Sequence, residues 1–280
     1  MIILTIIAVI LVLALFYMLL IAPRCVRRAD MSRMRGWIYA HRGMFTNPDI
    51  PENSMPAFAL AVEHGYGIEL DLHLTRDGKI VVYHDDQLER VCGADGRIED
   101  LTYDEVTRLR LFGTDEHPPL FTDFLALVNG QVPLIIELKG RSRDTSLADA
   151  TYEILKGYSG DYCIESFNPM LIRRFRKIAP KTATGLLMTD YSKDKDNRKF
   201  LLFNSFIQNA LARPDFIAYD KTCDKNFVFR LICAVFNPYT AAWTIRTRED
   251  FVRCRREYDM PICENLAEIH EAYSNAEKQN

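Results

Sequence analysis

Short apolar segments alternate with amphipathic segments along most of this chain, and this alternation constrains the fold more than any other feature. Strands that alternate with helices build parallel β/α units. The part after about Gly36 has roughly 245 residues, which suits one α/β barrel domain. The candidate strands are Trp37–Ala40, Gly67–Leu72, Ile80–Tyr83, Leu134–Leu138, Tyr162–Glu165, Ala183–Met188, Phe216–Tyr219 and Ala241–Ile245. About eight such strands predict a closed TIM-type (β/α)8 barrel.

The N-terminal segment Met1–Ala22 carries no charged side chain. A helix of this length, rising ~1.5 Å per residue, would be about 33 Å long and could cross a hydrocarbon core of about 30 Å. A cleaved signal peptide would need a basic residue before a shorter apolar core, and none precedes this run. A buried core helix is a further alternative, but a uniformly apolar N-terminus argues against it. We therefore expect one N-terminal transmembrane helix.

Five arginines follow the apolar segment: Arg24, Arg27, Arg28, Arg33 and Arg35. We expect a transmembrane anchor at 1–22, a basic juxtamembrane linker at 23–36 and the barrel at 37–280. Basic residues close to the end of a span favour the cytoplasmic side. Seven cysteines also fit a reducing compartment better than an oxidising one. The chain is thus predicted to be a single-pass membrane protein with a cytoplasmic catalytic domain.

Charge and cysteine usage exclude several other classes. A net charge of −3 provides no basic field for nucleic acid, so no nucleic-acid partner is expected. The cysteines form no CxxC pair, which argues against a zinc site and a disulfide framework. The charged run Ser192–Lys199 is predicted to be a solvated loop or helix start without a special role. The oligomeric state is left open.

Two predicted strands place carboxylates at the same pole of the barrel. Residues i and i+2 of a strand share a face, so Glu69 and Asp71 point the same way, as do Glu137 and Lys139. Carboxylates this close repel one another unless a cation lies between them. Three carboxylates without cysteine form a hard oxygen site, which selects Mg²⁺, Ca²⁺ or Mn²⁺ over Zn²⁺. We expect one such divalent cation on Glu69, Asp71 and Glu137.

A histidine is expected beside these acids. Asp77-Gly78 is a strong turn signal, and Asp71 and His84 are equally far from it. If the chain folds back about this turn, the two residues lie opposite each other. Four other histidines are interpreted as ordinary surface or core residues: His64, His73, His117 and His270.

His41, Arg42 and Gly43 follow the first predicted strand. Arg42 can bind a phosphate through its forked guanidinium group, and Gly43 allows a sharp backbone turn. His41 titrates near neutral pH and can transfer protons. In TIM barrels the active site lies at the carboxyl ends of the strands, where all of these groups are predicted to be. The pattern favours an anion site with proton-transfer chemistry.

An ordered set of short motifs extends this pattern. The set consists of Ala40–Gly43, Pro51–Ser54, Ala57-Phe58, Glu69–Asp71, Thr75–Gly78, His84-Asp85, Glu137–Lys139, Ser166–Asn168 and Trp243-Thr244. In this order the motifs resemble the glycerophosphodiester phosphodiesterase family, over roughly Trp37 to Ile262. The family often ends its barrel with a Gly-Val-Asp-Gly-Ile-Ile-Thr-Asp-like stretch, and Tyr258–Asn265 departs from it, which leaves the last strand and the substrate headgroup open. The insertion at about Val91–Pro119 is short, so a small cap and an open site are expected.

The resemblance implies hydrolysis of glycerophosphodiesters to glycerol 3-phosphate and an alcohol, with one divalent cation. It implies Glu69, Asp71 and Glu137 as metal ligands, His41 and His84 as catalytic residues, and Arg42, Lys139 and Trp243 as substrate-binding residues. The glycerol hydroxyl would attack phosphorus, giving a cyclic phosphate that water opens. We favour His41 as the first base and His84 as the acid. Trp243 would pack either against the glycerol carbons or in the barrel core.

Three alternatives compete with this interpretation. A lysophospholipase D or a phosphoinositide-type phospholipase could use the same scaffold, and the anchor would hold the site near lipid. A catalytically inactive, lipid-binding barrel would be expected to lose a histidine or a metal ligand, whereas this chain keeps the full set. An enolase-like metalloenzyme spreads its acids over three strands, which does not fit a Glu-x-Asp pair.

Overall fold

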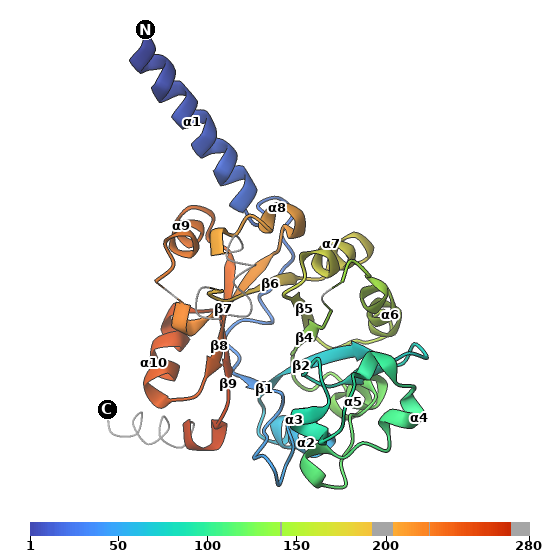
Figure 1. The fold of residues 1–280 in the computed structure, drawn as a ribbon. Coiled ribbons are helices and arrows are strands. Elements are labelled where there is room, and N and C mark those ends of the chain that lie inside the picture. Colours follow the sequence, from blue (N-terminus) through green and yellow to red (C-terminus); the bar gives the residue numbers. More distant parts are fainter. Residues whose placement is uncertain (141, 192–203, 224, 270–280) are drawn as a thin grey trace, which may run out of the picture.

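Eight parallel strands close into a barrel (Figure 1). The computed structural model describes residues 1–140, 142–191, 204–223 and 225–269, so the charged run at 192–199 and His270 lie outside the described residues. The barrel strands are β1 (Tyr39–His41), β2 (Gly67–Leu74), β4 (Leu134–Leu138), β5 (Tyr162–Ser166), β6 (Thr184–Met188), β7 (Phe216–Asp220), β8 (Tyr239–Ile245) and β9 (Met260–Cys263). They pair in this order, and β1 pairs with both β2 and β9. The predicted TIM-type barrel is confirmed.

One predicted barrel strand was wrong. The segment Ile80–Tyr83 gives β3 (Ile80–Val82), which pairs antiparallel with β2 and lies outside the barrel. The eighth barrel strand is β9, which was absent from the predicted set. It is short, and Pro261 within it cannot donate a ladder hydrogen bond, so its sequence does not resemble that of an interior strand. Pairing with β1 and β8 makes it a strand.

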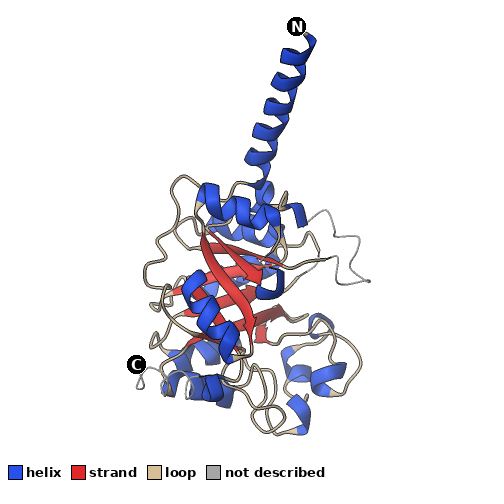
Figure 2. Cartoon of the chain, turned by 90° about the vertical axis from the view of Figure 1, so that its left-hand side faces the viewer, coloured by secondary structure: helices blue, strands red, loops and turns tan. Residues whose placement is uncertain are grey.

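Helices cover the outside of the barrel (Figure 2). The longer ones are α2 (Met55–Glu63), α5 (Phe121–Val128), α6 (Ser146–Leu155), α7 (Pro169–Ile178), α9 (Phe227–Phe236) and α10 (Arg248–Glu257). Side chains of Ser54, Asn168, Asn226 and Thr247 cap α2, α7, α9 and α10 by accepting backbone N–H groups of their first turns. These caps start each helix directly after a strand or loop, which leaves the predicted site residues at the strand ends.

The interior of the barrel has its own hydrophobic core, distinct from the layer between strands and helices. Tyr39, Phe216 and Met260 belong to this interior core, and so do Met31 and Met34 from the segment before β1. The Tyr39 hydroxyl donates to the Met34 carbonyl oxygen at 2.7 Å. The segment between α1 and β1 therefore packs against the amino ends of the strands, opposite the expected active site.

The connection between β3 and β4 forms a small separate cap. It contains α3 (Glu89–Cys92) and α4 (Tyr103–Val106), and short 3-10 turns lie at Ile98–Asp100 and Leu111–Gly113. A local apolar cluster holds it together, made of Val81, Tyr83, Leu88, Val91, Ile98, Val106 and Leu111. Its small size agrees with the expectation for this insertion.

Helix α1 (Ile2–Ile21) projects away from the barrel in both views (Figures 1 and 2). It is the one helix in the described part of the chain that is long and apolar enough to cross a membrane, and a signal sequence would meet the same criterion. Its carboxyl end is bound to the barrel next to α8 (Asn209–Ala212). Asn209 donates to the Ile21 carbonyl oxygen at 2.7 Å, and Arg213 donates to those of Leu19 and Ala22 at 2.8 Å. The transmembrane assignment and the domain boundaries stay predictions.

Candidate active site

The turn after β1 carries Arg42 over the carboxylates of β2. Arg42 and Gly43 have φ values of 56° and 82°, in the left-handed region that favours glycine. A Cβ atom on Gly43 would lie 2.9 Å from the backbone C and O atoms of Ala57, so only glycine fits here. The Arg42 backbone N–H donates to Glu69 Oε2 at 3.1 Å as well as to the Glu69 carbonyl oxygen. The turn therefore fixes the start of α2 and the acid cluster relative to each other.

The three predicted acids meet at the carboxyl ends of β2 and β4. Glu69, Asp71 and Glu137 are buried, and one carboxylate oxygen from each lies within 4.8 Å of the others. Asp71 is directly opposite Glu137 in the strand register. Burial, with repulsion from the neighbouring acids, raises the pKa of Glu69 well above its usual value. Burial also raises the pKa of Glu137, to about 7.

Cationic side chains surround Asp71. Lys139 Nζ forms ion pairs with Asp71 Oδ1 at 2.9 Å and with Glu137 Oε2 at 2.8 Å. Although burial opposes it, the charges of Lys139, His84 and Arg42 lower the pKa of Asp71 well below its usual value. Three buried carboxylates this close together provide the hard oxygen ligands that a divalent cation prefers, so the residues fit a metal site.

His41 is held by a carboxylate from the far end of the chain. Its Nδ1 lies 2.8 Å from Glu264 Oε1, and its Nε2 lies 3.9 Å from Glu69 Oε2. Arg246 holds Glu264 through contacts of 2.6 and 3.0 Å. Burial lowers the pKa of His41 to about 4, although Glu264 acts in the opposite direction. A neutral His41 that donates its Nδ1–H to Glu264 has a lone pair on Nε2, facing the acids.

His84 has a different carboxylate partner. Its Nδ1 lies 2.6 Å from Asp85 Oδ1, and Arg90 links Asp85 to Glu52 through charged hydrogen bonds of 2.6–3.1 Å. The His84 side chain is 31% exposed, against 10% for that of His41. Burial and the charge of Lys139 lower the pKa of His84, with the opposing charge of Asp71 acting against them. His84 is thus the histidine that faces the open side of the site.

The predicted pairing of Asp71 with His84 was wrong by one residue. Asp71 lies opposite Tyr83, whose N–H donates to the Asp71 carbonyl oxygen at 3.0 Å. The prediction assumed a two-residue loop at Asp77-Gly78. The hairpin closes instead between Thr75 and Lys79, around a three-residue loop with Gly78 at φ 77°. His84 lies past the end of β3 and still interacts electrostatically with Asp71.

One protein family matches this chain along most of its length. The sequence model of the glycerophosphoryl diester phosphodiesterase family matches residues 41–259, most of the chain. The chain belongs to this family. A glycerophosphodiester phosphodiesterase of Caldanaerobacter subterraneus is 33% identical over 165 residues, which is 55% of this chain and 67% of that protein. A glycerophosphodiester phosphodiesterase of Bacillus altitudinis is 30% identical over 57% of this chain and 69% of its own length. The chain thus spans about two thirds of the length of these relatives.

Solved structures agree with the barrel. A phosphodiesterase of Oleispira antarctica, solved with its product sn-glycerol-3-phosphate, has a TM-score of 0.71 at 20% identity and covers 86% of this chain and 98% of its own. A glycerophosphodiester phosphodiesterase of Thermotoga maritima has a TM-score of 0.66 at 25% identity and covers 84% and 97%. Membership of the glycerophosphoryl diester phosphodiesterase family confirms the predicted enzyme class, a phosphoric diester hydrolase.

Several acidic or amide side chains of this phosphodiesterase site were not assigned roles from the sequence. Asn53 donates to Asp71 Oδ2 at 2.8 Å, and Glu52 accepts from Arg42 at 2.6 Å. These contacts explain the Pro51–Ser54 motif, whose members were quoted without a function. Glu165 is buried opposite Glu137, and burial with repulsion from Glu137 and Asp71 raises its pKa.

Glu264 had no usable signal in the sequence, because its segment departs from the family pattern and lies beyond the matched residues. Asp85 follows His84 directly, and this adjacency was the available signal for its role. His73, which was interpreted as structural, is buried, and its Nδ1 lies 2.9 Å from Glu99 Oε1.

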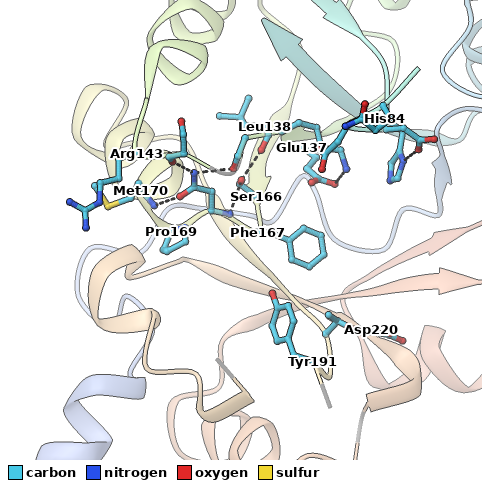
Figure 3. Close-up of a pocket in the computed structure, with 18 of the residues that line it drawn as sticks. His84, Glu137, Leu138, Arg143, Ser166, Phe167, Pro169, Met170, Tyr191 and Asp220 are labelled. Atoms are coloured by element: carbon cyan, nitrogen blue, oxygen red, sulfur yellow. Dashed lines mark hydrogen bonds and ion pairs between the residues drawn. The ribbon is translucent and has the colours of Figure 1, made fainter. Parts of the chain in front are cut away.

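An open cleft of about 880 Å³ has His84 and Lys139 in its lining, and Figure 3 shows His84 at one end of it. Phe167, Pro169 and Met170 form an apolar part of its wall, and Tyr191 and Asp220 lie across from them. Trp243 packs edge-on against Phe167, with ring centroids 5.7 Å apart, and also contacts the interior core. The Trp243 ring thus lies between the interior core and a residue of the cleft wall. This position is compatible with packing in the barrel core and with packing against the glycerol carbons.

Proposed function

We propose that this protein hydrolyses glycerophosphodiesters to glycerol 3-phosphate and an alcohol in a metal-dependent reaction. The observation that carries the proposal is the buried cluster of Glu69, Asp71 and Glu137, flanked by two histidines that each have a carboxylate partner. The names of its relatives support the substrate class, and a structural neighbour was solved with glycerol 3-phosphate as product.

We propose Glu69, Asp71 and Glu137 as ligands of one Mg²⁺, Ca²⁺ or Mn²⁺ ion. When bound, such an ion would lower the pKa of the glycerol hydroxyl and offset charge on the phosphate. Arg42 and Lys139 lie at the same mouth and would add positive charge around the phosphate oxygens. Both side chains are held in place by acids, Arg42 by Glu52 and Lys139 by Asp71 and Glu137.

His41 and His84 would share the proton transfers. His41 is buried and neutral at pH 7, so its Nε2 can accept the proton of the glycerol hydroxyl as that oxygen bonds to phosphorus. His84 lines the cleft and would give a proton to the leaving alcohol as its bond to phosphorus breaks. The negative phosphodiester favours the protonated form of His84. Water then opens the cyclic phosphate with the roles reversed.

A second candidate function is lysophospholipase D cleavage of lysophospholipids at the same site. The apolar wall of Phe167, Pro169 and Met170 favours it, since an acyl chain could lie there. A catalytically inactive, lipid-binding barrel is disfavoured because the proposed ligands and both histidines are all present.

We further propose that α1 is a single transmembrane anchor and that the barrel faces the cytoplasm. The length of α1 and its exposed apolar surface support the anchor. The arginines that follow it and the seven cysteines, all without a disulfide among the residues described, support the cytoplasmic side.

A product assay on the full-length protein tests the reaction and its metal. The protein is offered glycerophosphodiesters and lysophospholipids with Mg²⁺, Ca²⁺ or Mn²⁺, and release of glycerol 3-phosphate is expected to stop when the ion is chelated. Asp71→Asn should raise the metal concentration needed for half-maximal rate, because it removes one ligand charge. Full activity in excess chelator would rule out the metal. Preferential cleavage of lysophospholipids would select the second candidate.

A further inference from the structure

Exposed large hydrophobic side chains are few beyond the apolar segment at 1–22. In the rest of the described chain they are Val26, Phe167, Phe227 and Val235. Phe167 lines the catalytic cleft, which accounts for its exposure. The other three lie in two segments that the fold brings to the base of α1, namely the turn after α1 and helix α9. A soluble surface normally scatters such residues, so their concentration at one place indicates a contact surface.

Helix α9 is apolar on two faces. Phe229 and Ile232 are buried against the barrel, whereas Phe227 and Val235 are 76% and 54% exposed on the outer side. Leu231 lies between these two at helical spacing and is half-buried. A helix that is apolar all round normally buries its second face as well. Helix α9 is about 15 Å long, too short to cross a bilayer but long enough to lie in its interface.

Hydrogen bonds hold both ends of α9 beside the base of α1. At the amino end, Asn226 donates to the Asn204 carbonyl oxygen at 3.2 Å, and the next carbonyl oxygen, of Ser205, accepts from Tyr17 of α1 at 3.0 Å. At the carboxyl end, Arg28 donates to the carbonyl oxygens of Phe236 and Asn237 at 2.7 Å. Figure 1 accordingly shows α8 and α9 on either side of the base of α1.

The same surface carries positive charge. Arg27, Lys225 and Arg230 are exposed beside the apolar residues. Asp30, which is exposed four residues after Val26, is the one acid within the described residues 25–30 and 225–236. Apolar residues flanked by exposed arginine and lysine form the pattern of an interfacial helix that binds anionic lipid headgroups.

We propose that the outer face of α9, together with the turn Cys25–Arg27, rests in the headgroup layer of an anionic bilayer. This inference depends on the proposed anchoring by α1 but not on the proposed reaction. With α1 and α9 both in contact with lipid, the barrel has two attachments and a fixed orientation. Figure 1 views the barrel along its axis, and α1 extends from the side of the barrel. The end of the barrel that carries the proposed active site would therefore open parallel to the membrane surface.

Tryptophan quenching by brominated lipids tests the contact. The full-length Phe227→Trp variant is reconstituted into vesicles of phosphatidylcholine with phosphatidylglycerol, whose acyl chains carry bromine. Tyr103→Trp, on α4 of the cap, is the matched control, and the parent protein gives the background from Trp37 and Trp243. The added emission of Phe227→Trp should fall at least twofold in brominated vesicles, and that of the control should not change.

The outcomes separate the two membrane proposals from the reaction. Protein that floats with vesicles but shows no quenching at position 227 overturns the α9 contact alone, and Val235→Trp repeats the measurement at a second exposed site. Protein that does not float with vesicles overturns both the anchor and the α9 contact. Glycerophosphodiester hydrolysis, assayed on the same samples, is expected to match the parent in each variant, since none of these residues lies in the catalytic machinery.

Discussion

Each proposed catalytic histidine is oriented by a carboxylate, but the two carboxylates come from different distances along the chain. Asp85 is the residue next to His84, whereas Glu264 is 223 residues away from His41. A carboxylate on Nδ1 fixes which nitrogen carries the proton and leaves Nε2 for the substrate. The burial of His41 and the partial exposure of His84 fit the different roles proposed for the two rings.

We expect His41→Ala and His84→Ala each to lower kcat by about 10²–10⁴-fold, which is typical for the loss of a general acid or base. Both variants should stay folded, because neither ring belongs to the hydrophobic core. Turnover and thermal melting are measured together. Near-native turnover in a folded variant would remove that histidine from the mechanism.

Glu264→Gln should lower kcat by about 10–100-fold, the usual effect of losing a partner that orients a functional histidine. The Glu264 carboxylate stabilises protonated His41 and so raises its pKa against the effect of burial. Without that charge the pKa of His41 falls further, and the acid limb of the kcat/KM profile should move to lower pH. An unchanged profile would show that Glu264 does not act on the base. Asp149→Asn, on α6, is the control and should leave the profile unchanged.

The turn between β1 and α2 contacts several of the proposed site residues. It carries Arg42, it bonds to Glu69 on β2, and the Arg42 carbonyl oxygen accepts the Asn53 N–H at 3.0 Å. Asn53 in turn holds Asp71. A shift of this turn would therefore disturb the proposed phosphate-binding arginine and the proposed metal ligands together.

Gly43→Ala should destabilise the protein by about 2 kcal/mol or more, because a left-handed conformation alone costs an alanine about 1–2 kcal/mol. The added Cβ atom would also clash with the Ala57 backbone at 2.9 Å. Gly65→Ala is the matched control, because Gly65 also has a positive φ of 69° but has no atom within 4 Å of the added Cβ. Chemical denaturation measures both. Equal losses would show that the close packing at Gly43 does not matter.

In the molecule as a whole, the segment between α1 and the barrel is bound to the fold. Arg24 contacts Asp215 at 3.4 Å, Arg35 contacts Asp259 at 2.7 Å, and Arg28 is bound to backbone carbonyl oxygens. Arginines held in this way attach the segment to the barrel, and they also add to the excess of basic residues next to α1. Arg27 stays exposed and can contact lipid. The anchor and the barrel are thus joined through several contacts.

At the scale of the whole chain in its membrane, we predict that the barrel lies on the cytoplasmic side. Protease added to intact cells or spheroplasts should leave the barrel uncut, because basic residues beside a span are retained in the cytoplasm. A thiol reagent that cannot pass membranes should likewise leave Cys92, which is partly exposed on α3 of the cap, unlabelled. Cutting and labelling before permeabilisation would place the active site outside the cell. Permeabilised cells, in which both should occur, provide the control.

Local patterns along the chain were enough to predict the barrel class and the acid cluster. Strand and helix periodicities are local, so the alternation of elements and the shared face of Glu69 and Asp71 can be read from neighbouring residues. The order of the motifs identified the family for the same reason, since each motif is short. The roles predicted for the site residues stay predictions until they are tested.

The closure of the barrel and the surroundings of its histidines depended on tertiary contacts. Strand β9 contains Pro261 and is too atypical to be recognised alone, and it forms because β1 and β8 offer it partners. The length of the loop between Thr75 and Lys79 decided which residue of β2 lies opposite each residue of β3, and so where His84 lies. One residue more or less in the loop shifts every cross-strand pair of the hairpin. Glu264 reaches His41 only because closure brings the last strand beside the first. Such contacts join residues far apart in the chain, and local periodicity carries no information about them.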